Sequence, residues 1–335
     1  MGSDAADPTR QPSPVGGRPR ASVPWKHPGY DYAPSVIEEG GVRKVWWCGN
    51  ERLEAFRDYI YYREQVLATG KLSPIRRVLG PRAGKWDSRF TCDPSVVRGS
   101  FLNPEDAGVY TYAMYYTGTS SMTGQRNAIG LAFSNDGSRW KRFQNGGKPL
   151  ISPAGRDLDS ELCYGAGQPS AHNGGAAAIS LFYMDDSATG WCSDRTFVRA
   201  SPNGIHFDAP VPVSPFPIQI SNRGAHVDPH PADADFALEP SSGLFYAAIG
   251  TPGHHDGRFQ FGVYRMLAGE LMVGQGDWEL QAVVDTASTG RRLNDSPAFL
   301  TDGSGNLAGP PGEARVYFGT GSRLLSRDIG TTRVH

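Results

Sequence analysis

Acidic side chains recur along the chain shortly before short apolar runs. A protonated carboxyl group can deliver a proton and an ionised one can accept a proton, so carboxyl groups that converge can catalyse acid–base reactions. If the runs are strands that begin at one centre, these side chains meet there although they lie far apart in sequence. We therefore expect catalysis to rest on the following residues: Asp93, Asp31, Glu161, Asp235 and Asp295.

Aromatic, basic and amide side chains lie beside the same runs. Aromatic rings can stack on a flat ligand or a sugar ring, and Arg can pair with a neighbouring carboxylate or an anionic substrate. The segment 226–230 alternates His, Asp and His, which places polar groups on one side of an extended chain and suits proton transfer or metal ligation. A solvated loop there, and plain surface charge at the arginines, remain the alternatives. The expected substrate-binding residues are Trp25, Trp86, Arg89, Tyr164, Gln168, His226, Asp228, His230 and Arg292, and no metal ligands are assigned.

A repeat supplies the elements that position these side chains. A small or acidic residue near Pro-Ser or Ser-Pro is followed by an apolar run, a turn and an aromatic run, whose rings are expected to pack in the core. Such internal repetition is typical of arrays of one supersecondary unit. The copies begin near residues 33, 93, 168, 235 and 295.

The second half of the repeat also recurs. Asn135-Asp136-Gly137 and Asn203-Gly204 each separate two short runs, and Asn or Asp before Gly is a strong hairpin signal. Two hairpins per copy give four antiparallel strands, and sheets of this kind arranged radially form a propeller. The sequence therefore predicts an all-β, five-bladed β-propeller of four-stranded antiparallel blades over residues 23–335, with a β-sandwich as the alternative. The segment Glu51–Glu64 is compatible with a helix in a loop of the first blade.

Composition narrows the class of protein. Lys and Arg number 33 against 34 Asp and Glu, so the chain lacks the positive field of a nucleic-acid binder. No apolar run approaches the roughly 18 residues of a membrane-spanning helix. Residues 1–22 lack the apolar stretch of a secretory signal and are expected to form a disordered arm, which favours a cytoplasmic protein unless the start is truncated. The four cysteines show no metal-binding spacing and are expected to be buried thiols, with disulfides as the alternative.

Several of these motifs together resemble a known enzyme group. Cys92–Val96, Tyr115–Gly118, the 129–140 hairpin and Tyr164–Ser170 are similar to segments of glycoside hydrolase family 43 and related families. The resemblance spans residues from about 30 to 325 and implies a five-bladed propeller of the β-xylosidase and α-arabinofuranosidase group. It also implies that one carboxylate activates water, a second donates a proton to the leaving oxygen, and a third, at Asp93, orients that acid.

The chain departs from this pattern at two positions. Ala33 stands where the group has its base, and Gln168 stands where it has its acid. Neither side chain can perform that proton transfer. Asp31, two residues before Ala33, and Glu161, before Pro169, are the expected replacements. The resemblance requires no cofactor, and it allows a structural calcium ion in the channel beside a His of the fourth blade.

The leading hypothesis is a glycoside hydrolase-like enzyme that acts on a glycoside or polyhydroxylated small molecule at the centre of the propeller. The loss of the base and acid favours two alternatives, a non-hydrolytic reaction in natural-product biosynthesis and a non-catalytic carbohydrate-binding propeller. We expect a saccharide or other small molecule as the partner, with no nucleic acid and no membrane. A propeller closes on itself, so a monomer is expected.

Overall fold

A computed structural model describes residues 29–51, 57–154, 163–189, 195–216, 232–251, 259–323 and 326–334. These residues form an all-β structure whose antiparallel units of consecutive strands we call blades. The β1–β4 blade contains β1 (Gly29–Glu39), β2 (Val42–Glu51), β3 (Tyr59–Val66) and β4 (Arg76–Leu79). The β5–β8 blade contains β5 (Phe90–Asn103), β6 (Gly108–Thr119), β7 (Ala128–Ser134) and β8 (Lys141–Arg142).

The remaining blades follow the same order along the chain. The β9–β12 blade contains β9 (Ala166–Asn173), β10 (Ile179–Asp185), β11 (Thr196–Ser201) and β12 (Val211–Pro212). The β13–β16 blade contains β13 (Ala232–Glu239), β14 (Leu244–Thr251), β15 (Gln260–Leu267) and β16 (Glu279–Val284). The last contains β17 (Leu293–Thr301), β18 (Ala314–Arg323) and β19 (Ser326–Val334). Short helices lie between strands, namely α1 (Ala268–Leu271), α2 (Thr286–Thr289) and the 3₁₀ turns Asn145–Gly147 and Asp186–Thr189.

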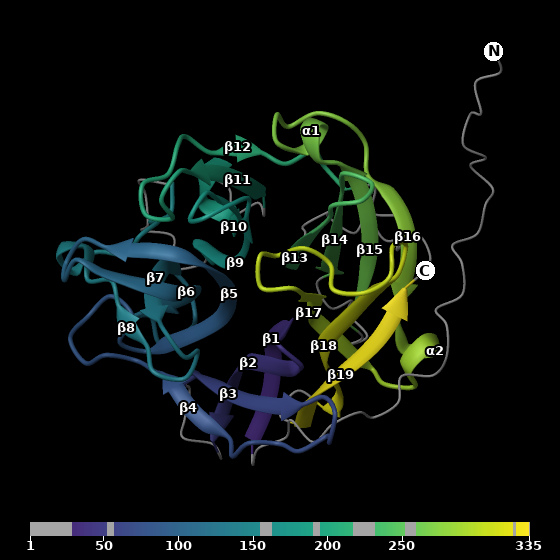
Figure 1. The fold of residues 1–335 in the computed structure, drawn as a ribbon, viewed down its shortest axis with the longest axis horizontal. Coiled ribbons are helices and arrows are strands. Elements are labelled where there is room, and N and C mark those ends of the chain that lie inside the picture. Colours follow the sequence, from purple (N-terminus) through teal and green to yellow (C-terminus); the bar gives the residue numbers. More distant parts are fainter. Residues whose placement is uncertain are drawn as a thin grey trace.

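The blades surround a common centre, with the first strand of each nearest to it (Figure 1). Within the described residues, three blades are separate four-stranded sheets, and the first and last blades join into one seven-stranded sheet. The joining pair is parallel and matches Val36 with Leu300 and Ile37 with Thr301. The beginning and the end of the described chain are therefore held together by a strand ladder.

A bulge interrupts every first strand near its start. In β1 the pairing moves from Tyr32–Cys48 to Ser35–Trp46, so two residues face one on the partner strand. Similar register shifts occur in β5, β9, β13 and β17. One bulge residue in each strand has a left-handed backbone, which is uncommon outside glycine and concentrates at functional sites. These residues are Ala33, Asp93, Gln168, Asp233 and Ser296, with φ of 45°, 46°, 52°, 53° and 49°.

In β1, β5 and β9, the residue two positions after the bulge residue joins neighbouring blades. The hydroxyl oxygen of Ser35 accepts a hydrogen bond from Val96 N at 3.1 Å, and that of Ser95 accepts one from Ala171 N at 2.9 Å. Ser170 accepts one from Phe236 N in the same way, at 2.9 Å. These three serines belong to the recurring Pro-Ser pairs, so the serine of each pair connects two blades.

The expected aromatic core is confirmed. Trp46, Trp47, Tyr115, Tyr116, Phe182 and Tyr183 are all buried. Two of them also connect blades, because Trp46 Nε1 donates to the carbonyl of Gly137 at 2.8 Å and the Tyr115 hydroxyl donates to that of Gly204 at 2.8 Å. Both acceptors lie in the predicted Asn/Asp-Gly turns. The turn before Gly137 separates β7 from β8, as predicted.

Two expectations are wrong. Residues 59–64 of the helix-compatible segment lie in β3, where Trp46 and Trp47 pair with Tyr62 and Tyr61 across the ladder. Packing of those aromatic rings outweighs the weak local helix preference. Cysteines are not free thiols either: Cys48 and Cys92 form a disulfide between β2 and β5, with their Cα atoms 5.0 Å apart, and Cys163 is also disulfide-bonded. The pairing of distant strands, invisible in the cysteine spacing, brings the first two together.

Candidate functional site

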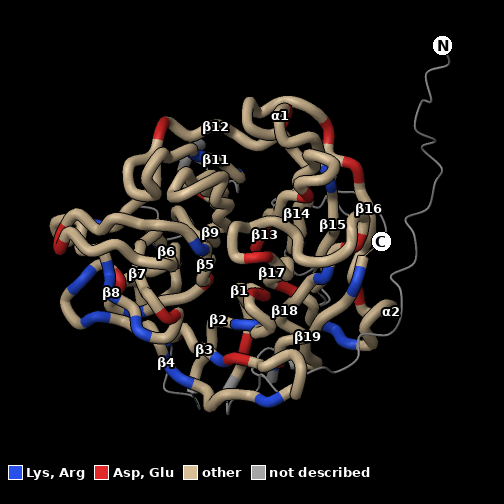
Figure 2. The backbone as a smooth tube through the Cα atoms, in the orientation of Figure 1, with Lys and Arg blue, Asp and Glu red and all other residues tan. Residues whose placement is uncertain are grey.

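A cavity lies where the first strands meet. Its volume is about 50 Å³, and the bulge residues Ala33, Asp93, Gln168, Asp233 and Ser296 all line it. Acidic positions gather where β1, β13 and β17 approach one another (Figure 2). A concave site with converging polar groups is the usual form of a small-molecule site.

Asp93 is the carboxyl group of the cavity whose surroundings raise its pKa most clearly toward neutrality. Its Oδ2 accepts a hydrogen bond from the Tyr164 hydroxyl at 3.2 Å. Burial, followed by the negative charge of Asp233, raises the pKa of Asp93 to about 7. Asp93 can therefore hold a proton near neutral pH, as a general acid must.

Asp233 is the neighbouring carboxylate in the ring of bulge residues. Gln168 holds it twice, since Gln168 Nε2 donates to Asp233 Oδ1 and Gln168 Oε1 accepts from Asp233 N at 2.8 Å. The Ser296 hydroxyl donates to its other oxygen at 3.0 Å. Burial raises the pKa of Asp233, while these donors and Arg327 oppose the rise. The Gln168 amide is thus committed to holding Asp233.

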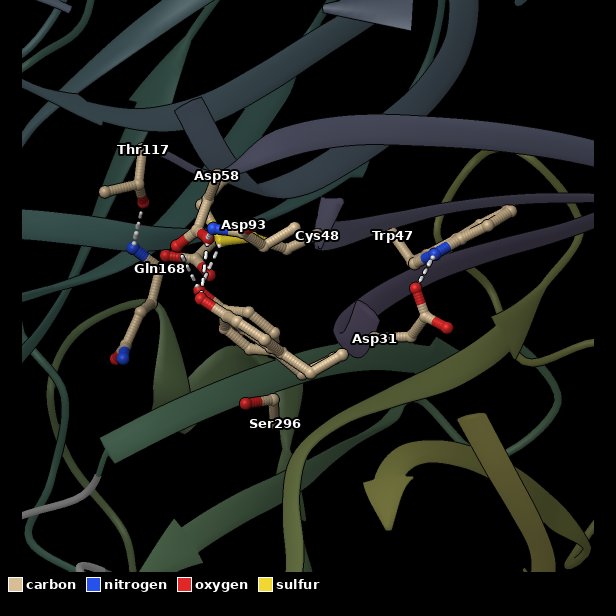
Figure 3. The surroundings of a disulfide bond; sticks show 12 residues. Asp31, Trp47, Cys48, Asp58, Asp93, Thr117, Gln168 and Ser296 are labelled. Atoms are coloured by element: carbon tan, nitrogen blue, oxygen red, sulfur yellow. Dashed lines mark hydrogen bonds between the residues drawn. A yellow bond between two sulfur atoms is a disulfide. The ribbon is translucent and has the colours of Figure 1, made fainter. Parts of the chain in front are cut away.

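A second buried carboxylate, Asp58, lies beside the Cys48–Cys92 disulfide (Figure 3). The hydroxyls of Tyr30 and Tyr32 donate to its Oδ1 and Oδ2 at 2.7 and 2.9 Å. Burial raises the pKa of Asp58, and these hydrogen bonds oppose the rise.

Asp295 is paired rather than open to the cavity. Its Oδ2 lies 2.9 Å from Arg327 Nη1, and both side chains are buried. Burial raises the pKa of Asp295 to about 7 although Arg327 lowers it. The guanidinium of Arg327 also lies over the rings of Tyr32 and Phe259, at 5.8 and 5.7 Å.

Asp31, the expected replacement for the base, does not line the cavity. It is fully buried, and its Oδ1 accepts a hydrogen bond from Trp47 Nε1 at 2.7 Å, away from the group around Asp58 and Asp93 (Figure 3). The expectation assumed that alternation keeps residues 31 and 33 on one face. The bulge between Tyr32 and Ser35 breaks that alternation, so Ala33 reaches the cavity and Asp31 does not.

Asp235 lines the cavity but takes the connecting position that serine has in other blades. Its Oδ2 accepts from Phe299 N at 2.7 Å, and its Oδ1 accepts from the Ser170 hydroxyl at 2.7 Å. Burial raises the pKa of Asp235 to about 6. Its hydrogen bonds join β13 to the neighbouring first strands, so we interpret its role as structural.

The other predicted residues fall into three groups. Tyr164 and Gln168 belong to the group around Asp93 and Asp233. Trp86 stacks on Tyr116 with ring centroids 6.0 Å apart, Arg89 donates its backbone N–H to Thr119 O at 2.9 Å, and Arg292 is exposed. A last group lies outside the described residues: Trp25, Glu161, His226, Asp228 and His230.

From the sequence, no catalytic or binding role was assigned to Asp58, Asp233, Ser296 or Arg327. A signal existed for two of them. If the repeat copies are aligned so that Asp235 matches Ser95 at the start of an apolar run, Asp233 matches Asp93. If Pro297 is aligned with Pro34, Ser296 matches Ala33. Asp58 and Arg327 lie on second and third strands or beside them, where the repeat carries no comparable signal.

The described residues contain one group of side chains with metal-ligand geometry, Cys48, Asp58 and Cys92. The two sulfur atoms of this group are joined in the disulfide, so they do not supply thiolates. The His-rich segment that a channel ion would use lies outside the described residues. Among the helices of the described chain, none has the length and apolar character needed to span a membrane.

Comparisons with known proteins show the fold. No family model and no curated protein matches the chain. Among solved structures, an α-L-arabinofuranosidase from Lactobacillus brevis matches with a TM-score of 0.61 at 8% identity, over 91% of this chain and 90% of that one. A GH62 α-L-arabinofuranosidase catalytic domain from Coprinopsis cinerea matches with a TM-score of 0.57 at 14% identity, over 96% and 95%. An endo-arabinase from Bacteroides thetaiotaomicron matches with a TM-score of 0.55 at 9% identity, over 95% and 96%. Over nearly its whole length, the chain shares its fold with these glycoside hydrolases.

Proposed function

We propose that the protein is a glycoside hydrolase-like enzyme built on a five-bladed propeller, with its substrate in the central cavity. The observation that carries this proposal is Asp93, a carboxyl group at the cavity whose pKa of about 7 lets it hold a proton near neutrality. The fold it shares with arabinofuranosidases supports a glycoside or similarly hydroxylated small molecule as the substrate class.

In this proposal Asp93 is the general acid. Its proton passes to the glycosidic oxygen while the bond from that oxygen to the anomeric carbon breaks, and Asp93 is left ionised. The hydrogen bonds from Gln168 and Ser296 favour the ionised form of Asp233, and in this form its charge would both raise the pKa of Asp93 and stabilise the positive charge that develops on the sugar. The role differs from the orienting role that family resemblance implies for Asp93, because here the position of the usual acid is occupied by Gln168.

An assay with aryl pentofuranosides and pentopyranosides tests the proposal. Asp93→Asn should lower kcat/KM at least about 100-fold on poor leaving groups, since proton donation contributes roughly that much. Asp31→Asn is the matched control, because it makes the same change in a buried aspartate outside the cavity and keeps an oxygen for Trp47. Equal loss in both variants, or no turnover of any glycoside by the folded parent, would count against the proposal.

A second candidate function is a non-hydrolytic reaction in the same cavity. It is favoured by Ala33 and by the two hydrogen bonds that Gln168 makes with Asp233. In that case a ligand would bind without hydrolysis, and Asp93→Asn would change the pH dependence of binding. Calorimetric titration with free pentoses and with the glycosides of the panel distinguishes the two.

We further propose that the protein acts as a monomer in an oxidising compartment rather than in the cytoplasm. The Cys48–Cys92 disulfide supports this compartment, because such bonds are rare where thiols are kept reduced.

A further inference from the structure

The first blade brings no proton-accepting group to the ring of bulge residues. Ala33 occupies its position there, and a methyl group cannot activate water. Asp31 is buried against Trp47, on the other side of the strand. If the protein hydrolyses glycosides, the proton acceptor must therefore come from another part of the chain.

Tyr32, directly before Ala33, is hydrogen-bonded to a base. Its hydroxyl lies 2.9 Å from Asp58 Oδ2, while Tyr30 holds the other oxygen of Asp58 at 2.7 Å. The rings of Tyr30 and Tyr32 stack, with centroids 5.5 Å apart. An oxygen acid, a carboxylate that can take its proton and a third group that orients the carboxylate form the arrangement that activates oxygen nucleophiles in enzymes.

The backbone keeps this pair close to Asp93. The carbonyl of Asp58 accepts a hydrogen bond from Thr91 N at 3.2 Å, two residues before Asp93 on β5. Cys92, between Thr91 and Asp93, is tied to Cys48 by the disulfide, and its Sγ lies 3.0 Å from the Tyr32 hydroxyl. The first and second blades are thus joined on both sides of the pair.

Access favours the tyrosine as the group that meets water. Asp58 is only 6% exposed, and both of its oxygens already accept hydrogen bonds. Tyr32 keeps part of its surface exposed. Of the two side chains Tyr32 is therefore the less buried, and its neighbour Ala33 lines the cavity.

The charged groups around the pair come from three blades. Asp58 and Tyr30 face Tyr32 within the first blade, Asp93 faces it from β5, and Arg327 of β19 lies over its ring. Burial and the charge of Asp58 raise the pKa of Tyr32, and burial raises that of Asp58. The tyrosine thus stays protonated until a proton acceptor takes its hydrogen, and Asp58 accepts a proton more readily than an exposed aspartate.

We propose that Tyr32 and Asp58 act together as the proton acceptor that Ala33 cannot provide. As a water oxygen bonds to the anomeric carbon, one water proton passes to Tyr32 Oη and the Tyr32 proton passes to Asp58 Oδ2. Asp93 meanwhile gives its proton to the departing glycosidic oxygen, so the products are the free sugar, the alcohol, neutral Asp58 and ionised Asp93. This step rests on the proposed hydrolytic function and deepens it.

Conservative variants test the pair. Tyr32→Phe and Asp58→Asn should each lower kcat/KM at least about 100-fold, and the acid limb of the pH–rate profile should disappear from the residual activity of both. Tyr62→Phe, a buried first-blade tyrosine whose hydroxyl bonds to Glu64, is the matched control and should stay near the parent. Sodium azide, a nucleophile that needs no deprotonation, should accelerate Asp58→Ala and yield a glycosyl azide, but should not accelerate the parent.

The outcomes separate this proposal from the proposed function. If the parent and both variants hydrolyse the same glycoside within about threefold and with the same acid limb, the pair is not the acceptor although the enzyme is a hydrolase. If the folded parent hydrolyses none of the panel, the proposed function fails and the relay fails with it. Should Asp58→Asn not fold, as judged by thermal denaturation, Tyr32→Phe decides alone, because it removes only one hydroxyl.

Discussion

At the residue scale, several buried carboxyl groups in and beside the cavity have raised pKa values. The pKa is raised to about 7 for Asp93, about 6 for Asp235 and about 7 for Asp295, in each case chiefly by burial. Protons that are lost from an exposed aspartate near pH 4 are therefore retained in the folded protein. Asp93, which lines the cavity, is available for proton donation, and all three groups make the stability of the protein depend on pH.

We expect the free energy of unfolding to fall as the pH rises from about 4 to about 7. In this range the folded chain binds more protons than the unfolded chain, and each unit of pKa difference corresponds to about 1.4 kcal/mol. Asp93→Asn should raise the melting temperature at pH 8 and reduce its change between pH 5 and pH 8, because the amide never ionises. Thermal denaturation of both proteins at the two pH values measures this. An unchanged pH dependence in the variant would contradict the raised pKa of Asp93.

At the element scale, the bulged first strands do two things at once. Their left-handed residues, Asp93 among them, line the cavity, and the residues two positions later connect the blades. Pro-Ser pairs recur because the serine hydroxyl accepts a hydrogen bond from a backbone N–H in the first strand of the next blade. No strand partner would satisfy that N–H. In the β13–β16 blade a carboxylate, Asp235, performs the same task.

Ser95→Ala should destabilise the fold. It removes the acceptor of Ala171 N and leaves a buried N–H without a partner, which costs about 1–3 kcal/mol. Ser241→Ala, in an exposed turn, serves as the control and should change stability by less than about 0.5 kcal/mol. Urea denaturation gives both values. If the two variants are equally stable, the hydroxyl does not hold the blades together.

At the scale of the whole molecule, the loop between β17 and β18 joins blades that are distant in sequence. The carbonyls of Gly303, Ser304 and Gly305 accept hydrogen bonds from the N–H groups of Arg98, Asn173 and Leu238, which lie in the first strands of three other blades. Gly305 also lines the cavity, and the loop extends toward the centre of the molecule (Figure 1). Together with the parallel pairing of β1 and β17, this loop closes the circle of blades.

Gly305→Ala should therefore cost more stability than Gly312→Ala. Both glycines have positive φ, 88° and 77°, so both variants carry the backbone strain of about 1–3 kcal/mol. A Cβ at 305 would also lie 2.9 Å from Ala171 O and 3.0 Å from His172 Cα, whereas one at 312 meets nothing within 4 Å. Differential scanning calorimetry of the two variants compares them directly. A larger loss for Gly312→Ala would show that the loop does not act as a closure.

Much of the fold was readable from the sequence, because its determinants are local and repeated. Alternating aromatic runs, Asn/Asp-Gly turns and Pro-Ser pairs each report on residues near one another in the chain, and they predicted antiparallel blades, a buried aromatic core and a central site with Asp93. The prediction of a helix within residues 51–64 was wrong for the opposite reason, because residues 59–64 lie in β3. Its strand conformation depends on rings of β2, which local preference does not record.

The membership of the site was decided by tertiary structure. The sequence by itself indicated that carboxyl groups approach one centre, and the resemblance to a glycoside hydrolase group implied that Ala33 and Gln168 stand in place of a base and an acid. Only the folded chain decided which carboxyl groups reach the cavity, because a single bulge reverses the face of every residue before it and sends Asp31 to the core. Only strand pairing across blades placed Asp58 beside Tyr32 and joined Cys48 to Cys92, since those contacts depend on register and on distances that residue order does not encode.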